Sequence, residues 1–527
     1  MDDSFVTINR KALGRVAFLG SLYDVRTDRF SRETLFNDTI PDVAIKTVDI
    51  PHTHYDYVEK DTYAEKFSKL NVEAALKVSI LSGLVELEGS GKYITNEKQT
   101  DKTFKAALIY HISTKEEQLI INHSILSQHM SYEAFQSSNA THVVVGIKWG
   151  ANCCVTFEQQ LKDKNNARDI EGRLKAQLTK ALGPVGSIGI DGNTQIGEGE
   201  ISKQASFSVQ FYGDVVINTE HLPQSVDGVL HVMKNIPAFI ERSNEGKGKQ
   251  LEYILYPLQQ VARAFKQPIK TDIILKEING AIIQQIEHDI DEFLIAKRRF
   301  NDFFTLVESF KEHIPRKYYN GVKNKNLELI NEYCKFQDEI KTNLTKLRSN
   351  TANENEIQIV LERFRRSCCS SQGIDEYFRE NIKLKEKCQL LSLFQKKGIS
   401  LVKESVSPEL LPQEHDNTDI YIIYISDELQ ENERDKWIQQ YEYFMKIMKN
   451  TKNQSMSSDT TEPEFFLVDY DVHTNIDKSQ GVKIHFYRNG TKITDDYYTY
   501  QNKNLTESTP VERNQQQQGK EETNGST

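Results

Sequence analysis

The sequence lacks the features that mark several large classes of protein. It has no run of 18 apolar residues, so no helix is predicted to span a bilayer permanently. It has no Gly-x-Ser-x-Gly nucleophile elbow, and the string Gly89-Ser90-Gly91-Lys92 lacks the first glycine and the Ser/Thr of a phosphate-binding loop. The six cysteines include no Cys-x-x-Cys pair, and His52-Thr53-His54 has no third ligand at metal-site spacing. We therefore predict no enzyme activity, no cofactor and no metal.

An excess of positive charge is also missing. The chain has 66 Lys and Arg against 76 Asp and Glu, a net charge of −10, and a pI near 5.8, which disfavours nucleic acid as a partner. The first residues, MDDSFVTINRK, are acidic and no apolar run follows them, so no signal peptide is predicted. We expect a soluble protein that is cytoplasmic or released by a non-conventional route. Its cysteines are expected to be reduced, with disulfides as the alternative.

What the chain does contain are three regions of different periodicity, as its length of 527 residues allows. The first is rich in alternating and β-branched runs, the second in apolar residues at helical spacing, and the third alternates short strands with a helix. The predicted organisation is a sheet domain with embedded helices (1–265), a four-helix domain (266–397), a linker (398–418), a small α/β domain (419–500) and a disordered tail (501–527).

Several strands of the first region have one apolar and one polar face. In 205–215, the odd-numbered residues from Ala205 to Val215 are small or apolar, and the even-numbered residues are polar. Similar runs occur at 76–80, 104–112 and 187–196. Such a strand is long enough to cross a bilayer within a β-barrel. A half-buried strand of a soluble sheet has the same pattern, so both interpretations stay open on the pattern alone.

Four segments carry a resemblance to a known family. They are ALGRVAFLGSLYDVRTDRF (12–30), LKVSILSGLVELEGSGKYITN (76–96), THVVVGIKWGANCCVTF (141–157) and QFYGDVV (210–216). These segments resemble the N-terminal domain of the stonustoxin/verrucotoxin-like proteins, members of the perforin/cholesterol-dependent cytolysin (MACPF/CDC) superfamily. Thr141-His142-Val143, followed after six residues by Gly150-Ala151, is similar to the superfamily signature, although Asn139-Ala140 replaces its Tyr-Gly and Val143 its aromatic residue.

The resemblance continues to about residue 500 and implies the fold class. It implies an α+β multidomain protein: a bent antiparallel MACPF/CDC-like sheet with flanking helical clusters, then an all-α four-helix domain, then a small thioredoxin-like α/β domain. The last domain has no cysteine after Cys388, so thiol–disulfide exchange is not expected. The family toxins end in a PRY-SPRY domain, to which the resemblance does not extend.

The resemblance also implies a mechanism. In this superfamily, two helical clusters unfold after oligomerisation on a membrane and become amphipathic β-hairpins of a large barrel. Here the clusters correspond to about 63–103 and 160–203, and Gly146 and Gly150 are predicted to permit the bend of the sheet. The signature and bend residues are Thr141, His142, Gly146, Gly150 and Ala151. The residues predicted to face lipid are Leu76, Val78, Ile80, Leu108, Tyr110, Ile188, Ile190, Phe207, Val209 and Phe211.

Two functions follow from these observations. The first is a pore-forming or membrane-perturbing protein of the stonustoxin-like class, with membrane lipid and a like or paralogous subunit as partners. The second is a non-lytic intracellular interaction or scaffold protein that retains the same architecture. Charged residues within the first cluster, among them Glu86, Glu88 and Lys92, bear on the choice, because a lysine facing midplane lipid costs about 2–4 kcal/mol.

Overall fold

The computed structural model describes residues 6–161, 166–182, 207–215, 223, 225–269, 275–455, 462–477 and 481–507. By its internal contacts the chain divides into two compact units. The first comprises 1–302 with 329–375, and the second comprises 303–328 with 376–527. The helical range 266–397, which we predicted as one domain, is therefore shared between the two units. The predicted positions Ile188 and Ile190 lie outside the described residues.

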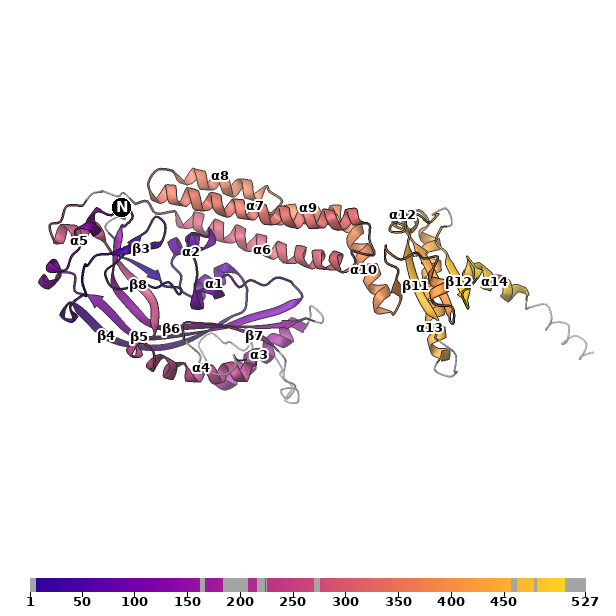
Figure 1. Ribbon diagram of the computed structural model, residues 1–527, viewed down its shortest axis with the longest axis horizontal. Coiled ribbons are helices and arrows are strands. Elements are labelled where there is room, and N and C mark those ends of the chain that lie inside the picture. The colour runs from indigo at the N-terminus through magenta and orange to yellow at the C-terminus, as the bar shows by residue number, and fades with distance from the viewer. Residues whose placement is uncertain are drawn as a thin grey trace, which may run out of the picture. The chain divides into compact units, whose positions relative to one another are not determined.

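The first unit is built on an antiparallel sheet with helices on both faces (Figure 1). Its longest ladder joins β4, β5 and β6, and β6 pairs beyond β5 with β7, β8 and β2. Its described strands are β1 (Ile8–Lys11), β2 (Ser21–Asp24), β3 (Arg29–Thr34), β4 (Ile45–Val58), β5 (Thr103–Leu119), β6 (His142–Gln160), β7 (Ser208–Gly213) and β8 (Lys249–Pro257). The helices that begin within it are α1 (Tyr63–Lys69), α2 (Ala74–Leu81), α3 (Asn166–Leu182), α4 (Val226–Glu241), α5 (Leu258–Ala264), α6 (Gly280–Ser309), α8 (Glu354–Arg365) and α9 (Ser371–Glu380).

The central strands are irregular at one level, and they curve there. The β4–β5 register shifts between Asp49 and His52, and the β5–β6 register shifts between Ser113 and Glu116. The partner of Ser113 is Gly150, where an added Cβ would lie 1.9 Å from the carbonyl oxygen of Ile112, so only glycine fits. Bulges increase the twist of a strand and bend it, and Figure 1 shows β4, β5 and β6 as curved strands.

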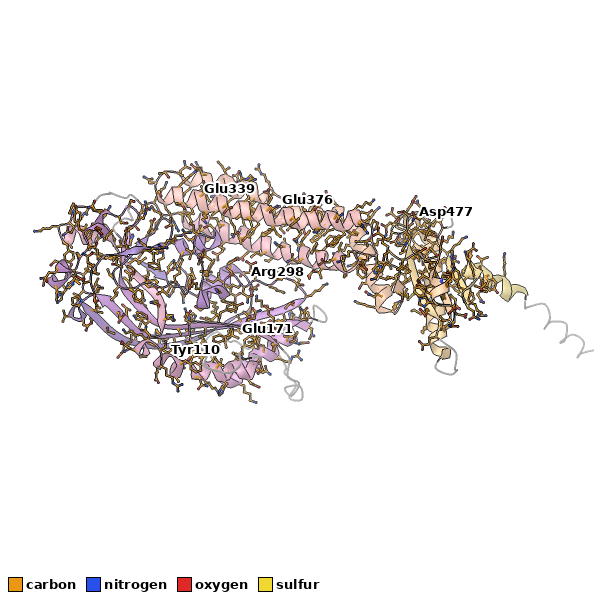
Figure 2. The ribbon with its side chains drawn as sticks, in the orientation of Figure 1. Tyr110, Glu171, Arg298, Glu339, Glu376 and Asp477 are labelled. Carbon is orange, nitrogen blue, oxygen red and sulfur yellow. The ribbon has the colours of Figure 1, made fainter. Side chains whose placement is uncertain are left out.

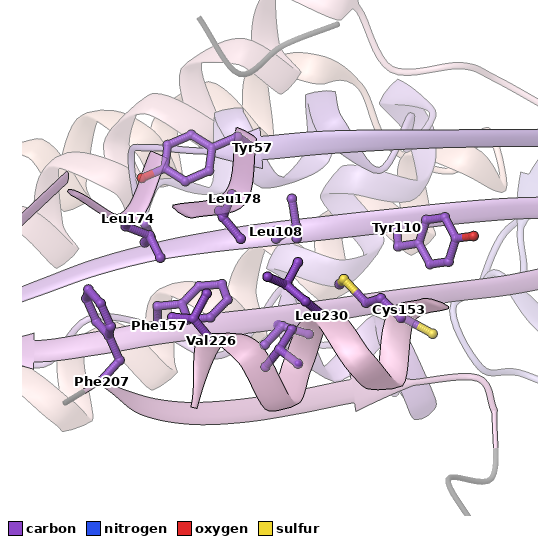
Figure 3. Close-up of a cluster of buried hydrophobic side chains, with 14 of the residues drawn as sticks. Tyr57, Leu108, Tyr110, Cys153, Phe157, Leu174, Leu178, Phe207, Val226 and Leu230 are labelled. Atoms are coloured by element: carbon purple, nitrogen blue, oxygen red, sulfur yellow. The ribbon is translucent and has the colours of Figure 1, made fainter. Parts of the chain in front are cut away.

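Two helices cover one face of this sheet. Their apolar residues, among them Leu174 and Leu178 of α3 and Leu230 of α4, pack against odd-numbered residues of β6 and even-numbered residues of β5 (Figure 3). This face and the two helices together form an extensive apolar core of the first unit. Helix α3 fits this position because Ile170, Leu174 and Leu178 are spaced four residues apart and lie on one side of the helix.

The second unit contains a smaller sheet of mixed direction, in the order β13-β12-β10-β11-β9. Strands β10 and β11 are parallel and α13 connects them, while β12 is antiparallel to β10. The thioredoxin-like assignment stays a prediction. Besides α7 (Arg316–Arg348), which begins in this unit, its elements are α10 (Ile382–Lys396), β9 (Ser400–Leu401), α11 (Leu411–Glu414), β10 (Asp419–Ile425), α12 (Asp427–Asn432), α13 (Arg434–Ser455), β11 (Glu464–Asp469), β12 (Ile484–Arg488), β13 (Thr491–Thr494) and α14 (Tyr497–Glu507).

Two predicted boundaries differ from the structure here. The range 398–418, predicted as a linker, contributes β9 to the sheet and places Val402 and Leu411 in its core. Its prolines and acidic residues suggested a free connection, but its apolar residues are buried by the sheet. The range predicted as a disordered tail begins within α14, which continues to Glu507.

Candidate functional site

Both long connections of the central sheet start from the same end of it. At that end, Val58 at the end of β4 pairs with Ala107, and Thr103 at the start of β5 pairs with Gln160. Ser208, the first residue of β7, pairs with Glu158 of β6. The segment between β4 and β5 and the segment between β6 and β7 therefore each join two strands that are neighbours in the sheet. We call them the first cluster (59–102) and the second cluster (161–207).

The first cluster is a set of short helices with strong end signals. Thr62 precedes α1, and its side chain accepts a hydrogen bond from the backbone N–H of Glu65. Gly83 follows the end of helix α2 and has a φ of +69°. The N–H of Leu84 bonds to the carbonyl of Ser79. A 3₁₀ turn at 89–93 follows. The helices are thus short pieces held by caps and by tertiary contacts, which is how a segment with little intrinsic helix stability stays folded.

The first cluster lies next to the face of the sheet that points away from α3 and α4, and a cavity remains between them. A cavity of about 1070 Å³ lies between them, and polar side chains such as Glu88, Lys92, Glu158 and Tyr212 contribute to its wall. Figure 1 shows α1 and α2 on the side of the sheet opposite α3 and α4. Polar side chains therefore line part of the space between the cluster and the sheet.

Buried charges lie within the first cluster and between it and the sheet. Within the cluster, the Lys66 ammonium lies 2.7 Å from the Asp61 carboxylate and 2.7 Å from the carbonyl oxygen of Asn96. From β5, Lys105 donates to the carbonyl oxygen of Asn96 at 2.8 Å and to its side-chain oxygen at 2.7 Å. Burial works to raise the pKa of Asp61, but Lys66 and Lys105 hold it below its usual value. The Asp214 carboxylate, which follows β7, accepts bonds from the backbone N–H and hydroxyl of Ser90, at 3.0 and 2.9 Å.

The part of helix α6 up to residue 302 binds the start of the first cluster. The Asp291 carboxylate accepts hydrogen bonds from the first two N–H groups of α1, those of Tyr63 at 2.7 Å and Ala64 at 3.2 Å. Burial raises the pKa of Asp291 to about 6 in spite of these bonds. Arg298, labelled in Figure 2, donates to the carbonyl oxygens of Asp61 at 2.6 Å and Lys98 at 3.0 Å.

Arg348, the last residue of α7, fixes α2 through a fully buried ion pair. Its guanidinium lies 2.8 Å from the Asp28 carboxylate, donates to the Ser79 hydroxyl at 2.9 Å, and donates to the carbonyl of Ala75 at 2.7 Å. The Ser79 hydroxyl also bonds to Asp28. Burial opposes ionisation of Asp28, but Arg348 and Arg10 hold its pKa well below its usual range. We call Arg10, Asp28, Ser79 and Arg348 the α2 anchor.

The sequence analysis did not find the α2 anchor or Asp291. Arg348 and Asp28 are 320 residues apart in the chain, and each occurs in an ordinary polar context. No periodicity or motif links them, because the contact exists only once α7 lies beside α2. The available signal was weak: an arginine in the last turn of a long helix, where positive charge is usual.

The predicted lipid-facing residues divide into two groups. Leu108 and Tyr110 on β5, Phe207 next to β7, and Val209 and Phe211 on β7 all belong to the core beneath α3 and α4. Leu76, Val78 and Ile80 are buried in α2 on the other side of the sheet, so the run 76–80 is helical in this state. None of these described residues is exposed.

The predicted signature residues all lie on β6 or directly before it. The Thr141 hydroxyl receives a bond from the N–H of Val25 at 3.0 Å, and the buried His142 ring lies 3.0 Å from that hydroxyl. Burial lowers the pKa of His142 to about 4. Gly146 lies at a register shift of the β6–β8 ladder, Gly150 lies at the bulge, and Ala151 is in the main core. Their proposed role as bend residues fits these positions and stays a prediction.

Comparison with known proteins identifies the family. A profile described as "SNTX, MACPF/CDC-like domain" matches residues 7–273. The chain belongs to this family. Residues 393–502 match a second profile, described as a domain of unknown function. The resemblance of residues 12–30 and 141–157 to stonustoxin-like proteins is therefore confirmed.

Several similar proteins are named as toxin subunits. The chain is 32% identical to stonustoxin subunit beta of Synanceia horrida over 238 residues, which is 44% of this chain and 33% of that one. It is 24% identical to neoverrucotoxin subunit alpha of Synanceia verrucosa over 513 residues, 92% of this chain and 71% of that one. The match to the beta subunit thus spans about a third of that protein's length.

A solved structure supports the fold over most of the chain. The stonustoxin structure superposes with a TM-score of 0.59 at 18% identity, over 93% of this chain and 70% of that one. At this identity the likeness bears on the fold alone. Within the residues that the structure describes, no helix has the length and apolar character needed to span a membrane, and no cluster of His, Cys, Asp or Glu is suited to a metal ion.

Proposed function

We propose that this SNTX-family protein assembles on membranes and forms a pore, with the first and second clusters unfolding into amphipathic β-hairpins. The observation that carries the proposal is the common origin of the two clusters at one end of the sheet. The connection between Val58 and Ala107 of the β4–β5 ladder is 59–106, and the connection between Glu158 and Ser208 of the β6–β7 ladder is 159–207, which are 48 and 49 residues long. Each segment joins neighbouring antiparallel strands, so each can lengthen its ladder without a change of topology.

The described contacts of the first cluster favour release as a unit. It is held by the α2 anchor, by Asp291 and by the contact of Lys105 with Asn96, and a cavity lies between part of it and the sheet. A buried ion pair contributes little net stability relative to its separated, hydrated ions, yet it fixes one geometry strongly. Such contacts stabilise one definite soluble conformation. β-Sheet hydrogen bonds can replace these contacts when the segment becomes a strand.

Oligomerisation and insertion must be coupled on this proposal. A single hairpin in lipid leaves unpaired backbone N–H and C=O groups, and each costs several kcal/mol. A closed ring of subunits removes that cost because every strand edge is paired. The partners we propose are therefore membrane lipid and further subunits, either copies of this chain or a related chain, since the relatives are named as alpha and beta subunits. We propose no enzymatic step.

The first test asks whether the purified protein releases a dye from liposomes and forms rings visible by electron microscopy. Vesicles of phosphatidylcholine, with and without cholesterol and phosphatidylserine, provide the membranes. We expect leakage that depends on protein concentration, with rings on the leaking vesicles. Absence of both in every mixture would contradict the proposal and favour the non-lytic scaffold.

A sharper test restrains the second cluster. Lys175 of α3 forms an ion pair with Glu59, the residue after β4. Glu59→Cys and Lys175→Cys, in a Cys334→Ser background that removes the exposed cysteine, are joined by a reagent that thiols cleave. We expect the tethered protein to lose leakage and to regain it after reduction, whereas the two single-cysteine variants treated with the same reagent stay active. Leakage that is equal before and after reduction would show that α3 does not leave the sheet.

A further inference from the structure

The register of the β4–β5 ladder determines where its continuation would turn. From His52 paired with Ser113 to Val58 paired with Ala107, the ladder runs without a shift. Continued in the same register, Leu70 opposes Thr95, Val78 opposes Leu87, and Leu81 opposes Leu84. The two residues left between the arms are Ser82 and Gly83. A two-residue loop is the commonest hairpin connection, and Ser-Gly is a typical turn dipeptide.

Gly83 is already suited to that turn. Its φ is +69°, and an added Cβ would find no atom within 4 Å. Position two of a two-residue hairpin loop needs a positive φ when the turn is type I′. Gly83, which follows α2 in the soluble fold, thus already has one of the two positive φ angles that a type I′ turn requires, whereas Ser82, at a φ of −85°, would change its backbone conformation.

The same register divides the hairpin into one apolar and one charged face. On the charged face, Glu73 opposes Lys92 and Lys77 opposes Glu88, so charges of opposite sign are paired across the strands. On the apolar face, alternate residues of 70–80 oppose alternate residues of 85–95, which is eleven residues on each arm. About 9–11 tilted residues span a bilayer core. The residues of the apolar face are Leu70, Val72, Ala74, Leu76, Val78, Ile80, Val85, Leu87, Gly89, Gly91, Tyr93 and Thr95.

The alternation of side chains along the strands also determines on which side of the sheet this apolar face would lie. Tyr55 and Tyr57 of β4 point into the core beneath α3 and α4, so odd-numbered residues of that arm stay on that side. The even-numbered Leu70, Leu76 and Val78 fall on the opposite side. On an extended strand without lipid, these apolar side chains would be exposed to solvent. In the soluble fold they are buried in α2 and its surroundings.

The described part of the second cluster obeys the same rule. On β6, Cys153 and Phe157 face α3 and α4, which places odd-numbered residues on that side. Ile170, Leu174 and Leu178 are even-numbered, and a strand that continues β6 without a shift would carry them on the opposite side. This agreement comes from a different ladder and a different segment.

We propose that the lipid-binding surface of the first cluster is its apolar face, formed in the β4–β5 register with Ser82-Gly83 at the tip. It lies on the side of the sheet opposite α3 and α4, and it takes the acyl chains of membrane lipid. Leu76, Val78 and Ile80 belong to it. Leu108, Tyr110, Phe207, Val209 and Phe211 lie on the other side and do not contact lipid. The inference rests on the proposed function and specifies its membrane surface.

The test reads the environment of adjacent residues on the second arm. Glu86→Cys, Leu87→Cys and Glu88→Cys, each in the Cys334→Ser background, carry an environment-sensitive NBD label at a site that is exposed or half-buried before insertion. On vesicles of phosphatidylcholine and cholesterol, we expect the emission of the label at residue 87 to rise and to shift to the blue. Nitroxide-labelled lipid in the vesicles should quench this emission. The labels at 86 and 88 are expected to keep the emission of an aqueous site.

A second measurement tests the register independently of the label. In the inserted hairpin, Lys77→Cys and Glu88→Cys face each other directly, whereas Lys77→Cys and Glu86→Cys are diagonal neighbours on the same face. Oxidation on vesicles is expected to link the first pair and to leave the second pair reduced, as read by peptide mass spectrometry. Preferential linking of the 77–86 pair would overturn the register.

The outcomes separate this inference from the proposed function. If the parent protein neither leaks nor forms rings, the proposed function is wrong and the lipid-binding surface falls with it. If the protein leaks while labels at 86 and 88 report lipid and the label at 87 reports water, the pore stands and only the face assigned here is wrong.

Discussion

At the scale of single residues, buried charges hold α2 in its place in the fold. Asp28 and Arg348 are both almost fully inaccessible to solvent, and the pair reaches Ser79 and the backbone of α2. Removing one partner of such a pair leaves the other charge buried without compensation, which costs more than the pair contributes when intact. The anchor therefore makes α2 sensitive to a residue far away in the sequence.

The corresponding prediction concerns Arg348→Met. It leaves Asp28 with Arg10 alone, and we expect the free energy of unfolding of the first unit to fall by about 3–5 kcal/mol. Urea denaturation measures the loss of stability, and hydrogen exchange measures the protection of the α2 amides. The control is Arg363→Met, which removes an ion pair with Glu339 whose arginine is 53% exposed, and which should cost less than about 1 kcal/mol. Equal losses in the two variants would contradict an anchoring role for Arg348.

At the scale of elements, the bend of the sheet depends on one close approach. Gly150 of β6 lies at the bulge opposite Ser113, where the β5 backbone leaves no room for a Cβ. Gly248 approaches from the other neighbour, since its own Cβ would lie 2.3 Å from the carbonyl oxygen of Gly150. The two glycines bring three stretches of backbone together at the level where the strands curve.

We predict that Gly150→Ala destabilises the first unit strongly. A methyl group placed 1.9 Å from the Ile112 oxygen forces the backbone to move, and overpacking of this kind costs about 1–3 kcal/mol or more. Thermal unfolding measures the change. The matched control is Gly280→Ala at the start of α6, where an added Cβ meets nothing within 4 Å, and its melting temperature should stay close to that of the parent protein. A neutral Gly150→Ala would remove the physical reason for a glycine at the bend.

At the scale of the whole molecule, each of the two units contains buried charges of its own. In the second unit, the Lys387 ammonium lies 2.5 Å from Asp469, 3.0 Å from Asp427 and 3.1 Å from Asp471, and its side chain is 2% exposed. Burial opposes its charge, but the three carboxylates hold its pKa above the usual value. Lys387 thereby joins α10 to the smaller sheet.

We expect Lys387→Met to destabilise the second unit by about 3–5 kcal/mol, because it leaves carboxylates buried without a counter-charge. Hydrogen exchange should show lost protection in β10 and β11 and unchanged protection in β5 and β6. Lys383→Met, four residues earlier on α10, removes a pair with Glu431 whose lysine is 71% exposed and should leave both sheets unaffected. Loss of protection in both units would mean that they unfold together.

The sequence predicted the classes of element better than their boundaries. Alternation in 104–112 correctly indicated a strand with one apolar face, because a period of two is a local property of the chain. The run 76–80 alternates as well, yet it is helical here, since Arg348 of the α2 anchor bonds to Ser79 and to the carbonyl of Ala75 in that helix. The range 398–418 has a linker's composition, but contacts with residues further along the chain bury part of it.

The family could be predicted from the sequence because the segments that resemble it, such as 12–30 and 141–157, are short and local, and that resemblance implied the antiparallel sheet and the two clusters. The charges that hold the first cluster and the register that pairs β4 with β5 became evident only in the folded chain. Those facts depend on contacts such as Arg348 with Asp28 and on strand register, and a shift of one residue in register moves every side chain to the other face.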